Sequence, residues 1–155
     1  MDDPTTPHDR ITELVLRWIG ALNADEALDA DAIASSDFLE HAIAPFGREA
    51  PGLVAGPAHL RDTVAWLRGQ FPDLRMTPEA ILVDQEMVCV RVLSEGTNLG
   101  PLGGRIPATG RPFRSEQSHW FRVQDGRLTE HWATRDDLTT MLQLGVLTPP
   151  GGAPR

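Results

Sequence analysis

Apolar residues recur every three or four positions in one stretch near the N-terminus: Ile11, Leu14, Val15, Trp18, Ile19 and Leu22. This spacing places them on one side of an α-helix. Asp9 precedes the stripe and has a side chain that can cap a helix N-terminus. The pattern therefore predicts a helix from Asp9 to about Asn23, with Trp18 packed in the protein core.

Two more helices are predicted in the first half of the chain. Residues 25–34 are rich in Ala and Asp and favour a short helix. A longer helix begins at Gly56-Pro57, where proline in the first turn costs no hydrogen bond, and it ends before Phe71-Pro72. Between them the sequence predicts an irregular loop through Pro45 and Gly52.

The second half alternates between apolar and polar residues, as strands do. Residues 76–83 and 87–97 predict one hairpin, and residues 113–124 and 127–135 predict another. Asp125-Gly126 joins the second pair and is a sequence that type I′ turns favour. A Gly- and Pro-rich loop, residues 98–112, separates the hairpins and is expected to be a lid or an interface. A short helix should follow the last strand. Helices followed by antiparallel strands predict an α+β fold with a curved sheet.

The turn at Asp125-Gly126 sets the register of the second hairpin. If this register continues unbroken, His119 lies opposite Trp132, and both belong to one mixed face. The members of that face are Ser115, Gln117, His119, Phe121, Val123, Leu128, Glu130, Trp132, Thr134 and Asp136. Aromatic groups beside a His and carboxylates are typical of a pocket wall. The side chains expected to contact a substrate are Gln117, Phe121, Trp132, Thr134 and, from the third helix, Trp66.

Composition excludes several classes of protein. The formal net charge of −8 disfavours nucleic acid or an anionic membrane as a partner. No apolar run approaches the roughly 20 residues of a membrane span, and the acidic N-terminus lacks the apolar stretch of a signal peptide. A cytoplasmic protein is expected. Residues 1–147 should form one domain, and the Pro- and Gly-rich tail, residues 148–155, should be disordered.

Metal and nucleophile chemistry lack their usual signatures. The His residues form no HExxH motif, the single Cys89 has no cysteine partner, and no GxSxG motif is present. No metal or cofactor is therefore expected. The remaining chemistry is acid–base catalysis by a carboxylate in an apolar pocket.

Asp136 is the main candidate for this carboxylate. Loss of hydration near Trp132 would raise its pKa toward the range useful at neutral pH. The alternative is that Asp136 caps the last helix, although Asp137 is the better cap by position and would leave Asp136 free. His119 lies on the same predicted face. His41 follows an aromatic residue and either reaches the pocket or lies at the surface.

Several motifs occur in a characteristic order. They are FPDL at 71–74, GTNLG at 96–100, PATGR at 107–111, DGRLTEHW at 125–132 and QLG at 143–145. Together with Asp136, this series resembles the SnoaL-like polyketide cyclases of the nuclear-transport-factor-two-like superfamily. The resemblance covers residues 10–147.

This resemblance implies a cone-shaped barrel, in which a curved antiparallel sheet and helices enclose a hydrophobic pocket. It also implies a homodimer or homotetramer. The family's acid/base aspartate falls on Asp136, four residues after the Trp of its E-x-W motif. A His that enters the pocket falls on His41, and a polar or His position of the penultimate strand falls near His119. Asn98 stands where many relatives have His.

The expected function is a cofactor-independent polyketide cyclase. In this hypothesis Asp136 removes a C–H proton, the enolate closes a ring on a ketone, and Asp136 or His119 returns the proton. One alternative is an epoxide hydrolase or an isomerase. The hydrolase would need an Asp–Arg–Asp set around a water, for which Arg91 or Arg135 with Asp136 is the nearest arrangement; the predicted register places Arg135 on the other face. The second alternative is a non-catalytic module that binds a small molecule.

Overall fold

The computed structural model describes residues 6–24, 27–43 and 53–151. The helices are α1 (Pro7–Leu22), α2 (Ala30–Ile33), α3 (Gly56–Gln70) and α4 (Asp137–Gln143). The strands are β1 (Ala34–Glu40), β2 (Leu53–Val54), β3 (Arg75–Asp84), β4 (Met87–Thr97), β5 (Pro112–Gln124) and β6 (Arg127–Arg135). The loop predicted through Pro45 and Gly52, and the end of the predicted disordered tail, lie outside the described residues.

The described strands form one sheet in the order β2-β1-β6-β5-β4-β3. Neighbouring strands run antiparallel except β1 and β6, which are parallel. The α+β fold predicted from the sequence is confirmed. The sheet is nevertheless open, with β2 and β3 at its edges, so the expected barrel closure and a fully antiparallel sheet were wrong.

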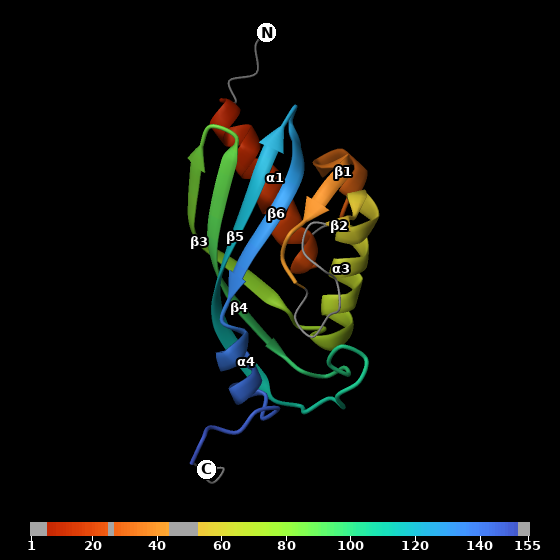
Figure 1. Ribbon diagram of the computed structural model, residues 1–155, viewed down its shortest axis with the longest axis vertical. Coiled ribbons are helices and arrows are strands. Elements are labelled where there is room, and N and C mark those ends of the chain that lie inside the picture. Colours follow the sequence, from red (N-terminus) through yellow and green to blue (C-terminus); the bar gives the residue numbers. More distant parts are fainter. Residues whose placement is uncertain (1–5, 25–26, 44–52, 152–155) are drawn as a thin grey trace.

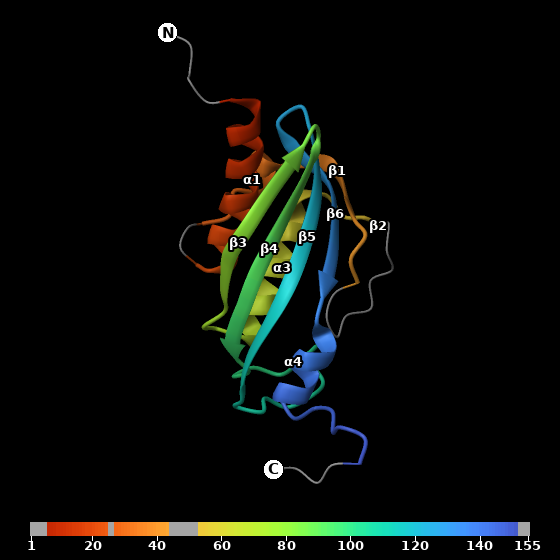
Figure 2. The same cartoon turned by 90° about the vertical axis from the view of Figure 1, so that its left-hand side faces the viewer.

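Both long helices cover the same face of the sheet. Figure 2 shows β3 to β6 in front, with α3 behind them and α1 at one side. In Figure 1 α4 and the loop between β4 and β5 lie together at one end of the sheet, near the last turn of α3. The described helices therefore leave the opposite, outer face of the sheet uncovered. No helix in the described ranges is long and apolar enough to cross a membrane.

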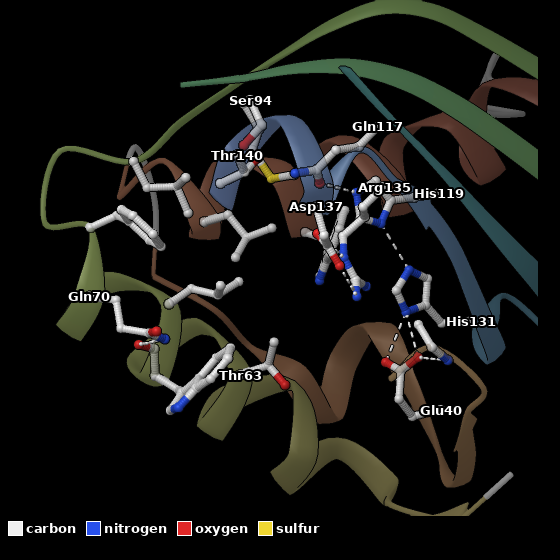
Figure 3. Close-up of a pocket in the computed structure, with 18 of the residues that line it drawn as sticks. Glu40, Thr63, Gln70, Ser94, Gln117, His119, His131, Arg135, Asp137 and Thr140 are labelled. Carbon is white, nitrogen blue, oxygen red and sulfur yellow. Dashed lines mark hydrogen bonds and ion pairs between the residues drawn. The ribbon is translucent and has the colours of Figure 1, made fainter. Parts of the chain in front are cut away.

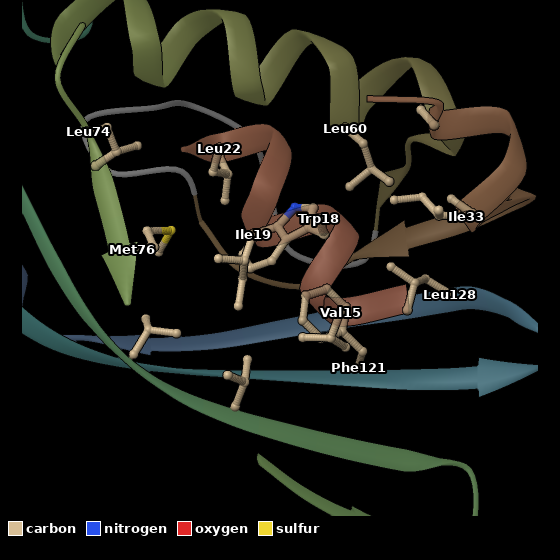
Figure 4. Close-up of a cluster of buried hydrophobic side chains, with 14 of the residues drawn as sticks. Val15, Trp18, Ile19, Leu22, Ile33, Leu60, Leu74, Met76, Phe121 and Leu128 are labelled. Atoms are coloured by element: carbon tan, nitrogen blue, oxygen red, sulfur yellow. The ribbon is translucent and has the colours of Figure 1, made fainter. Parts of the chain in front are cut away.

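The core lies between α1, α3 and the inner face of the sheet (Figure 4). Val88, Val90 and Val92 of β4 are fully buried at alternate positions, as the strand pattern predicts. Trp18 of α1 is 4% exposed, which confirms its place in the core. Its ring meets Phe121 edge-on at 5.1 Å between ring centres.

The first helix begins slightly earlier than predicted. Thr6, not Asp9, is its N-cap and accepts a hydrogen bond from the Asp9 backbone N–H. The Asp9 carboxylate accepts one in return from the Thr6 backbone N–H, at 3.0 Å. This reciprocal pair is a capping box, so Asp9 contributes from the first turn of the helix.

β1 occupies a segment that the sequence did not predict as a strand. Ser35, Ser36 and Asp37 favour turns and caps over strands. Phe38, two residues before the strand's last residue, is fully buried, and Leu39 pairs with Glu130 of β6. Contact with an existing strand therefore overrides a weak local preference.

The β5–β6 hairpin begins in the predicted register and then departs from it. Asp125 and Gly126 both have positive φ, as a type I′ turn requires, and Val123 pairs with Leu128. The next pair is Arg122 with Glu130, so Thr129 is an extra residue in a β-bulge. The bulge turns Glu130 outward and His131 inward. An unbroken register would have placed the Glu130 carboxylate in the core, where an unpaired charge is costly.

One bulge residue reverses the facing of every later β6 residue. His119 pairs with Ala133, and Trp120 pairs with Trp132. Trp132 and Thr134 therefore do not share the face of His119, and the mixed face predicted from the sequence was wrong beyond Leu128. Arg135, predicted on the outer face, lies instead opposite Gln117 on the inner face.

The loop between β4 and β5 is fastened at both ends through Asn98, which is fully buried. Its side-chain NH₂ donates to the backbone oxygen of Gly100 at 2.6 Å, and its side-chain oxygen accepts from Thr109 N–H at 2.8 Å. The Gln70 carbonyl of α3 accepts backbone N–H groups of Leu99 and Gly100. This loop therefore closes one end of the helix–sheet interior.

Gly100→Ala is expected to destabilise the fold by at least about 2 kcal/mol. A Cβ at position 100 would lie 1.8 Å from the carbonyl oxygen of Gly69. This oxygen belongs to the backbone, so it cannot move away as a flexible side chain could. Gly69→Ala is the control, because a Cβ there meets nothing within 4 Å and alanine favours a helix. Chemical denaturation should show loss of stability for Gly100→Ala alone. Equal stability of the two variants would contradict this account of the loop.

Candidate functional site

A cavity lies between α1, α3, the inner face of the sheet and α4. The empty space in and around it, with the open solvent at its mouth included, is about 870 Å³. Most of its wall is apolar and includes Trp18, Leu22, Trp66, Phe71, Met76 and Phe113. Polar side chains of β1, β5, β6 and α4 gather along one side, and α3 and β4 contribute further polar groups elsewhere in the wall. A mostly apolar pocket with a few convergent polar groups is the usual form of a small-molecule site.

Four of these polar side chains form a continuous row (Figure 3). Gln117 Oε1 lies 3.0 Å from His119 Nε2. His119 Nδ1 lies 3.0 Å from His131 Nε2, and His131 Nδ1 lies 2.8 Å from a Glu40 carboxylate oxygen. His119, His131 and Glu40 are buried. We call Gln117, His119, His131 and Glu40 the polar row.

The polar row holds a buried negative charge at one end. Burial alone would raise the pKa of Glu40, but hydrogen bonds from His131 and His59 outweigh it and lower the pKa to about 2. At the other histidine, burial lowers the pKa of His119 well below its ordinary 6.5, and the neighbouring charges of His131 and Arg135 act in the same direction. His119 is therefore a neutral imidazole at pH 7.

Two proton arrangements with a neutral His119 satisfy every member of the polar row. In the first both histidines are neutral, each donates from Nδ1 toward Glu40, and the Gln117 amide NH₂ donates to His119 Nε2. In the second, His119 carries its proton on Nε2 and donates to Gln117 Oε1, while His131 carries two protons. The second arrangement holds one proton more. A 180° flip of the Gln117 side-chain amide changes the group that faces His119 Nε2 from the donor NH₂ to the acceptor oxygen. The row can thus accept a proton at His119 Nε2 while the positive charge resides on His131, beside Glu40.

A second polar group lies near the row. Arg135 donates from Nε to Asp137 Oδ1 and from Nη2 to Asp137 Oδ2, both at 3.2 Å. Both side chains line the cavity, and Arg135 is 14% exposed. Asp137 is 46% exposed and so retains contact with solvent.

Three of the side chains predicted from the sequence line the cavity: Trp66, Gln117 and His119. Phe121 lies behind this wall instead. It is fully buried and stacks against His131 at 4.5 Å between ring centres. Phe121 therefore supports the polar row from the core, and its predicted direct contact with a substrate has no support in the geometry.

His41 and Trp132 do not line the cavity. Their rings stack on each other at 4.5 Å, and His41 Nε2 lies 2.8 Å from Glu130 Oε2. Side chains alternate along a strand, so Glu40 points inward where His41 points outward. The prediction that His41 enters the pocket was therefore wrong by one residue, because Glu40 is the residue that lines the cavity.

Asp136 lies at the surface, and the expectation of a desolvated carboxylate was wrong. Asp136 is the N-cap of α4, and its Oδ1 accepts the Thr139 N–H at 3.0 Å. Hydrogen bonds from Thr139 lower the pKa of Asp136. Asp136 and the exposed Thr134 border a shallow depression on the outer face. The sequence predicted Asp137 as the helix cap and Asp136 as the pocket residue, and the structure shows the reverse.

Sequence reasoning missed Glu40, His59, His131, Arg135 and Asp137 as cavity residues. His59 of α3 lines the cavity, with its Nε2 3.6 Å from Glu40 Oε2. Glu40 and His131 were present in the segments DFLEH and EHW. Their facing depends on β1 and on the bulge, and neither has a local signature. Within the described part of the chain, no cluster of three or more His, Cys, Asp or Glu side chains could hold a metal ion.

Comparison with known families connects this site to a class of enzymes. Residues 12–144 match the model of the SnoaL-like polyketide cyclases. The chain belongs to the SnoaL-like polyketide cyclase family.

Curated relatives in this SnoaL-like family are ester cyclases. Aklanonic acid methyl ester cyclase DnrD of Streptomyces peucetius is 33% identical over 150 residues, covering 92% of this chain and 97% of the relative. Nogalonic acid methyl ester cyclase of Streptomyces nogalater is 28% identical over 128 residues, covering 82% of this chain and 91% of the relative.

Solved structures of other proteins share the fold. IdmH, a putative polyketide cyclase from Streptomyces antibioticus, superposes with a TM-score of 0.73 at 26% identity, covering 87% of this chain and 98% of that chain. TsrD from Streptomyces laurentii has a TM-score of 0.78 at 23% identity, covering 92% and 99% of the two chains. TsrD therefore supports the architecture alone.

The buried, neutral His119 should make stability depend on pH. Its folded pKa lies below 6.5, so the unfolded chain binds the proton first as pH falls, and the protein loses stability below about pH 6.5. The slope from this one site is about 1.4 kcal/mol per pH unit. His119→Asn should flatten the dependence, measured by denaturation between pH 7 and about pH 5. The exposed His8, changed to Asn, is the control and should leave the slope unchanged; an unchanged slope in His119→Asn would count against a neutral His119.

Proposed function

We propose that this protein is a polyketide ester cyclase that closes a ring by an intramolecular aldol reaction. Aklanonic acid methyl ester and nogalonic acid methyl ester, which appear in the relatives' names, are the substrates to test first. The observation that carries the proposal is the polar row along one wall of a mostly apolar cavity. Such a wall holds a large apolar substrate and exposes it to one acid–base group.

The proposed reaction needs one proton acceptor and no oxidant. His119 Nε2 takes a proton from the carbon between two carbonyls, and the electron pair of that C–H bond becomes an enolate. The enolate carbon attacks a ketone carbon in the same molecule, forming one C–C bond and an alkoxide. The alkoxide takes the proton back from His119, so the product is an isomer of the substrate. The His131–Glu40 pair stabilises the positive charge between these steps.

Asp136 remains the residue implied by family resemblance as the acid or base. The geometry supports His119 instead, because His119 lines the cavity and Asp136 lies at the surface as a helix cap. Asp137 lines the cavity but is held by Arg135. The two assignments predict different results in the same activity assay.

His119→Asn should lower kcat by about a hundredfold or more, the usual contribution of a general acid–base group. Asp136→Asn should retain activity, because asparagine also caps helices well. The assay follows loss of either methyl ester by liquid chromatography, with dialysed protein and EDTA present, since no cofactor is proposed. Loss of activity in Asp136→Asn together with an active His119→Asn would return the role to the aspartate. Full activity of both variants would exclude both residues.

Product mass separates the rival functions in the same assay. A cyclase gives a product of unchanged mass, whereas an epoxide hydrolase adds a water. One observation favours the hydrolase alternative: Arg135 and Asp137 both line the cavity. The charge of Glu40, however, is bound by His131 rather than available to a water. A non-catalytic binding module would bind the esters without forming product.

We also propose that residues 1–147 act as one domain in the cytoplasm and assemble as a homodimer through the outer face. Paired positions on four strands align Leu82, Cys89, Trp120 and Trp132 in one row there. Leu82 is 71% exposed and Trp120 is 44% exposed. Ion pairs of Arg91 with Glu79 and Glu116 border the row, so a second copy meets both signs of charge. An apolar centre with a charged rim suits a protein interface.

Trp120→Lys should convert the dimer to a monomer, because an ammonium group would be buried against the partner copy. Light scattering coupled to size exclusion measures the mass directly. Leu138→Lys is the control, since Leu138 is 63% exposed on α4 and outside the proposed interface. A wild-type monomer, or a Trp120→Lys dimer, would refute this interface.

A further inference from the structure

Arg135 has no role in the reaction steps given above. It lies at the end of β6, where the bulge at Thr129 has turned it inward, opposite Gln117 of β5. Figure 3 shows its side chain directed into the cavity beside Asp137, on the side of the polar row. Among the described residues that line the cavity, it is the one Lys or Arg. A guanidinium stays charged at all ordinary pH, so the cavity has a fixed positive group.

The hydrogen bonds of Arg135 anchor one edge of its guanidinium. Nε and Nη2 donate to the two carboxylate oxygens of Asp137, and Nη2 also donates to the backbone oxygen of Ile43. These bonds use three of the five N–H groups. The two N–H groups of Nη1 have no acceptor among the residues that the structure describes. The side chain is therefore oriented by Asp137 and Ile43 and retains donor capacity.

The charge of Arg135 reaches the polar row. Burial is the main cause of the lowered pKa of His119, and the charges of His131 and then Arg135 add to it. The opposing carboxylate of Glu40 is bound by His131 at 2.8 Å. Negative charge is thus already matched at the Glu40 end of the row. At the Gln117 end, the negative charge of Asp137 is paired with Arg135 but remains partly exposed to solvent.

We propose that the two free N–H groups of Arg135 Nη1 bind an oxygen that carries negative charge on the substrate, in either a carboxylate or an enolised β-dicarbonyl. This rests on the proposed function for its connection to ring closure. The anchored guanidinium holds these two Nη1 donors in a fixed plane, whereas an ammonium is a flexible point charge, and hydrogen bonds between charged groups are stronger than those between neutral groups. An apolar cavity strengthens this contact, because few waters compete for the donors.

The proposal gives Arg135 a part in the chemistry. When the C–H proton moves to His119, the electron pair spreads over the two flanking carbonyl oxygens. A guanidinium already oriented toward these oxygens stabilises the charge as it develops. The substrate class is therefore a polyketide ester with a β-dicarbonyl unit that ionises within the cavity.

Ligand binding without turnover tests this inference. Trp18 and Trp66 line the cavity, so quenching of tryptophan fluorescence reports binding. Three naphthalene probes share one ring system: 2-naphthoate is an anion, 2-acetonaphthone is neutral, and 1-(2-naphthyl)butane-1,3-dione is a β-diketone. The wild-type protein should bind 2-naphthoate better than 2-acetonaphthone. It should also shift the absorption of the bound diketone toward that of the enolate.

Arg135→Met should weaken binding of 2-naphthoate by about tenfold, the usual effect of losing a charged hydrogen bond, and leave 2-acetonaphthone within about twofold. The enolate shift of the diketone should disappear. Arg135→Lys keeps the charge without the anchored Nη1 donors, so it should recover part of the naphthoate affinity and little of the enolate shift. Arg91→Met is the control, because it removes the same charge from the outer face.

Two results would overturn the inference. One is a wild-type protein that does not prefer 2-naphthoate over 2-acetonaphthone. The other is an Arg135→Met variant that weakens all probes equally, because Arg135 would then only shape the cavity. Neither depends on ring closure, so an inactive protein that still passes this test would remove the cyclase proposal and leave the anion site intact.

Discussion

The ionised carboxylate of Glu40, buried beside the cavity, is the constraint on which the site depends. A buried charge is tolerated only when it is paired and hydrogen bonded. His131 provides that partner, and it faces inward only because Thr129 is accommodated as a bulge. The bulge also brings Arg135 inward. One extra residue in one strand therefore sets the position of the proton-accepting row and that of the cavity's arginine.

Much of the fold follows from the sequence. The apolar stripe of α1, the Gly-Pro start of α3 and the Asp-Gly turn each have a local physical cause, and each element forms where it was predicted. β1 does not, because Ser35, Ser36 and Asp37 carry no strand preference. Its pairing with β6 becomes favourable only once the sheet exists, and that is a tertiary effect which no local pattern contains.

The site was predicted only as far as the register held. Gln117 and His119 lie on β5, before the turn, and their facing follows from strand alternation. Beyond Leu128 a slip of one residue exchanges the two faces, so Trp132 and Asp136 lie outside and His131 and Arg135 inside. Thr129 resembles any strand residue. What decides its conformation is the cost of burying Glu130, which depends on the whole packed structure.

The fastening of the β4–β5 loop divides it into parts with different freedom. Asn98 and Gln70 hold its ends, through contacts at Leu99, Gly100, Gly103 and Thr109. Gly104 and Arg105 form a turn between Leu102 and Ile106, whose backbones are hydrogen bonded to each other, and added residues in this turn lengthen a loop whose ends are already closed. Each doubling of such a loop costs only about 0.6 kcal/mol. This end of the molecule can therefore vary in length by insertion, while the acid–base row on β1, β5 and β6 stays in place.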